Sequence, residues 1–251
     1  MEPEKKQRNH DFLWFLLVFT ALFCSFYHKT LVSGFDLLPG DAGDARFNIL
    51  IAEHWIEYWK GELGFGETRF FYPFGNAMGF SDLSILFAWM EIPFRWMGLD
   101  ALRATQIVFF LIHFIGAGSC FYLLRKLLKL RFMPSVIGMM VICFGNPVLQ
   151  KIYHTQFYTY FLLPLLCCLL ICYCRCTEKY PRWKRMAFLS GAFFIFLLIL
   201  YTAYYTAFFT AFFSVAFAFG LAVAFIARQN WKDLKALRNW FRIRMVDFGI
   251  L

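Results

Sequence analysis

Long apolar stretches, separated by short basic runs, constrain this chain more than any other feature. They lie at residues 12–31, 83–98, 103–124, 133–149, 157–174 and 186–227. The last is long enough for two helices, with a tight turn near Tyr204 and Tyr205. A helix needs ~20 mainly apolar residues to cross the hydrocarbon core of a bilayer. The sequence therefore predicts an all-α, polytopic membrane helix bundle of about six to seven transmembrane helices.

The overall composition excludes a soluble fold. Hydrophobic residues make up 61% of the 251 residues and charged residues only 16%, too few to cover a globular surface. The eight cysteines lie in apolar segments or at one basic membrane edge, so no disulfide framework is visible. Lipid is the solvent that suits such a chain.

The net charge of +9 is distributed as the positive-inside rule requires for cytoplasmic loops. Basic residues gather at 125–131, 175–185 and 228–244, and no recognition motif accompanies them, which excludes nucleic acid as the partner. The first apolar run follows Lys5, Lys6 and Arg8 and lacks a small-residue cleavage site. We therefore expect a signal anchor after a cytoplasmic N-terminus (1–11), a transmembrane module (12–227) and a basic cytoplasmic tail (228–251).

The polar segment 35–82 has the opposite charge. It holds eight acidic residues against three basic ones, which places it on the extracytoplasmic side. Residues 44–60 within it predict an amphipathic helix lying on the outer membrane surface, with Trp55 and Trp59 beside its apolar stripe. The stripe consists of Phe47, Leu50, Ile51, His54 and Tyr58.

A parity condition applies to the run 83–98. If the N-terminus and every basic run are cytoplasmic, an even number of spans separates each neighbouring pair, yet three apolar runs precede Arg125. The weakest is 83–98, because it is short and carries Glu91, Pro93 and Arg95. We predict a non-crossing interfacial helix there; the alternative is a true span with the first basic run outside.

Three acidic residues of the outer segment are candidates for chemistry. Asp41 and Asp44 lie three residues apart in a Gly-rich turn before the amphipathic helix, and Asp82 precedes the next helix. Carboxylates at helix N-termini also act as caps, which would explain Asp82 and one of the other two. As a pair, Asp41 and Asp44 could serve as a general base or bind a divalent cation.

Further polar residues fall on the same predicted side of the membrane. Arg46 is either a snorkelling or ion-paired arginine or a contact for the phosphate of an anionic substrate. His154 and Gln156, in the turn 145–158, are candidates to bind phosphate or sugar hydroxyls, or they belong to a plain interhelical turn. Polar residues around Tyr201–Thr206 either line a pocket or form an aromatic belt.

These residues carry a family resemblance that covers about residues 12–225. Gly40-Asp41-Ala42-Gly43-Asp44-Ala45-Arg46, then Tyr72-Pro73 with Ser81-Asp82, then His154 and Gln156 before Pro164, form its pattern. The pattern resembles the N-terminal half of bacterial multi-spanning glycosyltransferases of the GT-C superfamily. The resemblance implies a location in the bacterial cytoplasmic membrane and a donor sugar carried on a polyprenyl phosphate, transferred at the outer face to an envelope acceptor.

The resemblance also implies roles. Asp44 or Asp41 would be the general base, Arg46 or His154 would offset charge on the departing lipid phosphate, and Tyr72, Asp82 and Gln156 would contact substrate. Such enzymes are usually longer, with further spans and often a soluble C-terminal domain, so we expect a truncated product. The alternative is a non-catalytic membrane protein, such as a lipid-linked sugar flippase or a subunit for polysaccharide assembly.

Overall fold

The computed structural model describes residues 2–37, 43–71, 73–145, 148, 154–176, 180–228, 238 and 242. All regular structure in these residues is helical, as the sequence predicts, and none of them lies in a strand. The α-helices are α1 (Glu2–Phe26), α2 (His28–Val32), α3 (Asp44–Trp59), α4 (Ile85–Trp96), α5 (Ala101–Tyr122), α6 (Phe132–Phe144), α8 (Leu163–Arg175), α9 (Arg182–Thr202) and α10 (Tyr204–Arg228). Shorter turns are η1 (Ala77–Phe80), η2 (Leu123–Leu127) and η3 (Thr155–Leu162).

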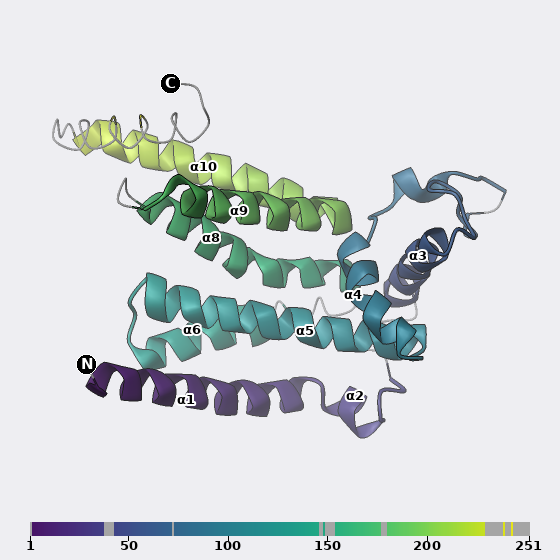
Figure 1. Ribbon diagram of the computed structural model, residues 1–251, viewed down its shortest axis with the longest axis horizontal. Helices are drawn as coiled ribbons and strands as arrows, with labels where there is room; N and C mark the ends of the chain where they lie inside the picture. The colour runs from purple at the N-terminus through teal and green to yellow at the C-terminus, as the bar shows by residue number, and fades with distance from the viewer. Residues whose placement is uncertain are drawn as a thin grey trace.

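The long helices lie side by side and alternate in direction, so the connections gather at two ends of the bundle (Figure 1). One end, at the left of Figure 1, holds the N-terminus and the basic connections after α5 and α8. The opposite end holds α2, α3, α4, η3 and the junction between α9 and α10. The acidic segment and the basic connections therefore lie at opposite ends of the molecule.

Helix α1 packs antiparallel to α5. In its first half, Asp11 forms an ion pair of 2.8 Å with Arg125 of η2, which directly follows α5. Just past its end, the Tyr27 hydroxyl lies 2.9 Å from Nδ1 of His113, halfway along α5. Helix α5 starts at the end of the bundle where α1 finishes. The segment between them, which includes α3 and α4, therefore leaves and re-enters the bundle at that same end.

The described helices match the predicted apolar runs better than they match the predicted number of spans. Three are long and apolar enough to cross a membrane: Ala101–Leu127, Gln156–Arg175 and Arg182–Thr202. His10–Phe26, Phe132–Phe144 and Tyr204–Gly220 are apolar but shorter. At 1.5 Å per residue, α6 is ~20 Å long, less than the ~30 Å of a bilayer core. The three long helices indicate a membrane protein, and a total of six or seven spans is not confirmed.

The predicted run 83–98 becomes α4, of 12 residues, with Pro93 inside the helix. It is not among the helices long and apolar enough to cross, and it lies at the same end of the bundle as α3 (Figure 1). This placement agrees with the parity condition. That α4 lies along the outer membrane surface stays a prediction, as does the cytoplasmic N-terminus.

The predicted helix 44–60 is present as α3, and most of the predicted stripe lies on its buried face. Ile51 and His54 are buried, and Phe47 and Tyr58 pack against the same small core, whereas Leu50 is exposed. This face packs against the protein itself, where Ile51, Ala52 and Trp55 join Met78 and Ala88.

The arrangement predicts a labelling pattern for single cysteines placed in a cysteine-free background. Met97→Cys and Gly64→Cys, at the α3–α4 end, should react with an impermeant maleimide from one side of sealed vesicles. Leu130→Cys and Trp183→Cys should react from the other side, because the bundle separates the two ends. Labelling of Met97→Cys from the side opposite to Gly64→Cys would mean that α4 crosses.

Candidate functional site

The site begins at the first residue of α3. Gly43, which has no side chain, occupies the N-cap position before the helix. The Asp44 carboxylate instead accepts a hydrogen bond from Nδ1 of His154, at the start of η3. Both side chains are about half accessible, at 46% for Asp44 and 37% for His154. Capping therefore does not explain Asp44, and two of the predicted site residues, 110 positions apart, are in contact.

Asn48, one turn further along α3, fixes this arrangement. Its Nδ2 donates to the carbonyl oxygen of Asp44 at 2.9 Å and to Oε1 of Gln156 at 3.2 Å. Its Oδ1 accepts from the Ser84 hydroxyl at 3.0 Å. Asn48 is buried, so a lost partner would leave a polar group unsatisfied. Sequence reasoning did not assign it a role, although its four-residue spacing from Asp44 places both on one helix face.

Asp82 and Ser84 connect this site to the junction between α9 and α10. The Asp82 carboxylate accepts from the backbone N–H of Tyr204, the first residue of α10, at 3.1 Å. The backbone N–H of Ser84 donates to the carbonyl oxygen of Thr202 at 3.2 Å. Burial raises the pKa of Asp82 above its ordinary value. Asp82 thus satisfies the start of α10, a distant helix, and not the start of α4 as a sequence-local cap would.

Two threonines close the network from the other side. The Thr159 hydroxyl donates to the carbonyl oxygen of Gln156 at 2.9 Å and lies 3.2 Å from the hydroxyl of Thr206. Thr159, Thr202 and Thr206 are all buried. The threonines of the polar interruption around 201–206 therefore belong to the same site as the outer segment, while Tyr201, Tyr204 and Tyr205 are exposed.

Other predicted site residues are not brought together. Arg46 is exposed on α3 and makes no ion pair with any residue that the structure describes. Asp41 and Tyr72 lie outside the described residues, so the proposed carboxylate pair with Asp44 has no observed geometry. Within the described ranges, no group of three or more His, Cys, Asp or Glu side chains could hold a metal ion.

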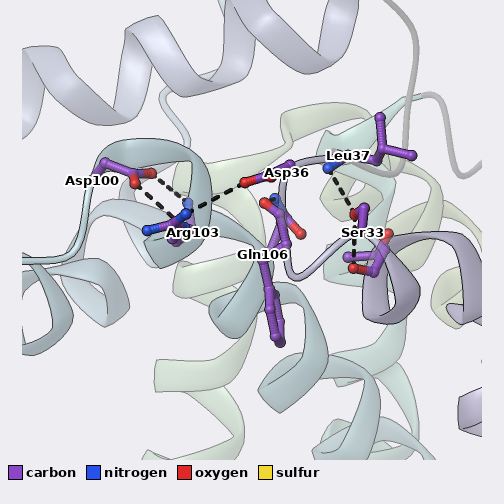
Figure 2. A network of polar contacts seen from close by, with 8 residues as sticks. Ser33, Asp36, Leu37, Asp100, Arg103 and Gln106 are labelled. Carbon is purple, nitrogen blue, oxygen red and sulfur yellow. Dashed lines mark hydrogen bonds and ion pairs between the residues drawn. The ribbon is translucent and has the colours of Figure 1, made fainter.

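A polar network anchors the start of the outer segment to α5 (Figure 2). Arg103 donates to Asp36 at 3.3 Å and lies 3.7 Å from Asp100, whose carboxylate also caps α5 at the backbone N–H of Arg103. The Nε2 of Gln106 donates to the carbonyl oxygen of Phe35 at 2.9 Å. Phe35 has a positive φ of 71°, so this hydrogen bond holds a turn that a phenylalanine rarely adopts. The chain is thereby directed from α2 toward α3.

A buried carboxylic acid lies between α4 and α5. Glu91 is fully buried and accepts a hydrogen bond of 2.8 Å from the Thr105 hydroxyl, and its second oxygen has no hydrogen-bond partner among the described residues. Burial raises its pKa to about 8, so the group is largely protonated at neutral pH. On the next turn, Arg95 pairs with Glu53 of α3 at 2.9 Å. These residues join α4 to both of its neighbours.

No protein-family model matches the chain, and no curated protein or solved structure is significantly similar to it.

The raised pKa of Glu91 predicts a pH-dependent stability. The folded state holds the proton more tightly than the unfolded state, whose pKa is about 4.5, so this stabilisation is complete below pH 4.5. It falls by about 1.4 kcal/mol per pH unit as the pH rises, and is lost above pH 8. Thermal unfolding in detergent between pH 5 and 9 should show this slope for the wild type.

The Glu91→Gln variant should remove most of this slope, because an amide keeps the neutral shape and does not ionise. Its melting temperature should exceed that of the wild type at pH 9 and approach it at pH 5. Glu62→Gln, at an exposed position, is the matched control and should retain the wild-type slope. Equal slopes for wild type and Glu91→Gln would refute the buried neutral acid.

Proposed function

We propose that this chain is a membrane glycosyltransferase, or the N-terminal portion of one, that transfers a sugar from a polyprenyl phosphate to an envelope acceptor at the extracytoplasmic face. One observation carries the proposal: the Asp44–His154 pair at the end of the helix bundle, half accessible and supported by Asn48 and Gln156. The proposal also rests on the resemblance of this region to GT-C enzymes. A water-facing acid–imidazole pair next to apolar helices suits a donor with a lipid tail and a polar head.

In the proposed mechanism Asp44 acts as a carboxylate, which only accepts hydrogen bonds, so Nδ1 of His154 is the donor in this pair. Nε2 of a neutral His154 is then a base, and it makes no hydrogen bond to any described residue. Asp44 fixes the tautomer and stabilises the imidazolium that forms when Nε2 takes up a proton. The proposed base is therefore His154 oriented by Asp44, in place of the Asp44 or Asp41 carboxylate that the family resemblance implied.

In the proposed reaction, the acceptor hydroxyl attacks the anomeric carbon of the donor. A new carbon–oxygen bond forms while the bond from that carbon to the phosphate oxygen breaks, and the phosphate leaves with the bonding electron pair. The hydroxyl proton passes to Nε2 of His154. Arg46, an exposed cation two residues from Asp44, is the candidate to bind the anionic phosphate.

Polar residues behind the pair supply rigidity without charge. Gln156 and Ser84 each form a hydrogen bond with Asn48, which fixes the start of α3 against η3. Proton transfer requires the reacting atoms within hydrogen-bond reach, so this support favours catalysis over loose binding.

If the protein were instead a flippase or an assembly subunit, His113 would be the candidate functional residue. It lies within the candidate span Ala101–Leu127, is fully buried, and is hydrogen-bonded to Tyr27. Ionisable residues inside spans are typical of transport pathways. The His113 ring is stacked on Phe161 at 4.2 Å and lies 4.5 Å from Phe144, an enclosed aromatic setting that favours a structural role.

The reaction can be tested without knowing the acceptor, since water can replace it. Purified protein in nanodiscs would receive a panel of radiolabelled polyprenyl-phosphate hexoses and pentoses, and release of free sugar would be measured. His154→Gln and Asp44→Asn should each lower turnover by about 100-fold or more, because each disables the proton acceptor. Asp41→Asn shows whether the second carboxylate also participates.

Asp36→Asn is the matched control, because Asp36 is an exposed acid at the same end of the bundle that pairs with Arg103. It should leave turnover unchanged. Turnover that survives both Asp44→Asn and His154→Gln would refute the acid–imidazole pair. Movement of intact donor between leaflets without sugar release would support the flippase alternative.

A further inference from the structure

A groove of about 860 Å³ lies between the C-terminal turn of α3 and the outward side of α4, away from the Asp44–His154 pair. We call it the tryptophan groove. It is lined by Ile56, Trp59, Lys60, Trp89, Ile92, Arg95, Trp96, Gly98, Leu99 and Asp100. Asp44 and Trp59 are the first and last residues of α3, so the groove and the pair lie at opposite ends of one helix.

Three tryptophans give the groove its character. Trp59, Trp89 and Trp96 are 40%, 47% and 85% exposed. Tryptophan side chains are highly buried on average, so three exposed ones in one groove are unusual. The rings of Trp59 and Trp89 are 6.5 Å apart. None of the three indole N–H groups donates to a described residue, whereas the buried Trp55 donates to the carbonyl oxygen of Leu83. Amphipathic rings with free donors are typical of a membrane–water boundary.

The charges of the groove favour an anion. Lys60 is exposed and makes no ion pair with any described residue. Arg95 is paired with Glu53, but only through Nη2, while Nη1 donates to the carbonyl oxygen of Leu99. The acid in the lining, Asp100, is engaged by Arg103 and the start of α5. Among the charged residues that line the groove, Lys60 is therefore the one whose positive charge is not paired with a described carboxylate.

One wall of the groove adjoins the start of a candidate span. Gly98 has a φ of 87° and turns the chain from α4 into α5, and this turn forms one wall. The candidate span Ala101–Leu127 begins directly after it. A site within three residues of the start of a span is at the boundary between hydrocarbon and headgroup.

We infer that the tryptophan groove binds the headgroup of an anionic phospholipid. The phosphate contacts Lys60 and the indole N–H groups, and the acyl chains leave over the exposed apolar surface next to Trp96 and Met97. The charge complementarity of Lys60 and the start of the adjoining span select a lipid over a soluble anion. This binding site does not depend on the sugar-transfer reaction proposed above.

Native mass spectrometry of the purified full chain would test this inference. The protein in detergent would be titrated with dioleoylphosphatidylglycerol or, in parallel, with dioleoylphosphatidylcholine. We expect the wild type to retain one phosphatidylglycerol preferentially. Lys60→Gln and Trp89→Ala should each weaken its retention by about tenfold, because each removes a donor to the phosphate.

Lys29→Gln is the matched control, an exposed lysine on α2 at the same end of the bundle but outside the groove. It should retain the lipid as the wild type does, and Lys60→Arg should restore binding to a folded protein. Equal retention of the two lipids by the wild type would overturn the inference. So would a loss with Lys29→Gln as large as with Lys60→Gln, which would indicate unspecific charge attraction.

Discussion

The antiparallel packing of α1 against α5 is the constraint on which the other features depend. The Asp11–Arg125 ion pair and the Tyr27–His113 hydrogen bond align the two helices near opposite ends of α1. This alignment returns the chain to the end of the bundle that it left, so the segment between them must fold over that end. Helices α3 and α4 consequently lie at that end of the bundle, where the turns between the other helices contact them.

The positions of most long helices could be predicted from the sequence, because membrane helices are recognised by their length and their apolar composition. The break inside 186–227 falls at Ala203, next to the predicted turn. The number of spans could not be read in the same way. Helix α6 has only 13 residues, although the apolar run that predicted it is longer. An apolar run in the sequence does not show at which residue the helix ends. The stripe predicted for α3 was right at Ile51 and His54, which are buried, and wrong at Leu50, which is exposed.

The candidate site was predictable only in part. Asp44 was chosen from one segment and His154 and Gln156 from another, and the structure brings them into one network. Asn48 and Ser84 hold that network together, but their importance depends on partners 108 and 118 positions away. In the sequence, Glu91 served only as an argument against a membrane crossing by residues 83–98. Its burial against Thr105 could not be predicted, because it depends on how α4 packs on α5.

The two proposed sites share α3, and this has a physical consequence. A helix of 16 residues is ~24 Å long and stiff, so the acid–imidazole pair and the tryptophan groove are held at a fixed separation. Asn48 secures one end of the helix to Gln156 and Ser84, while Glu53 secures its middle to Arg95 of α4. A phospholipid headgroup bound at Lys60 would therefore set the depth of Asp44 relative to the bilayer. A polyprenyl-phosphate donor has its phosphate at headgroup depth, so the position of its anomeric carbon relative to His154 would follow from that anchoring.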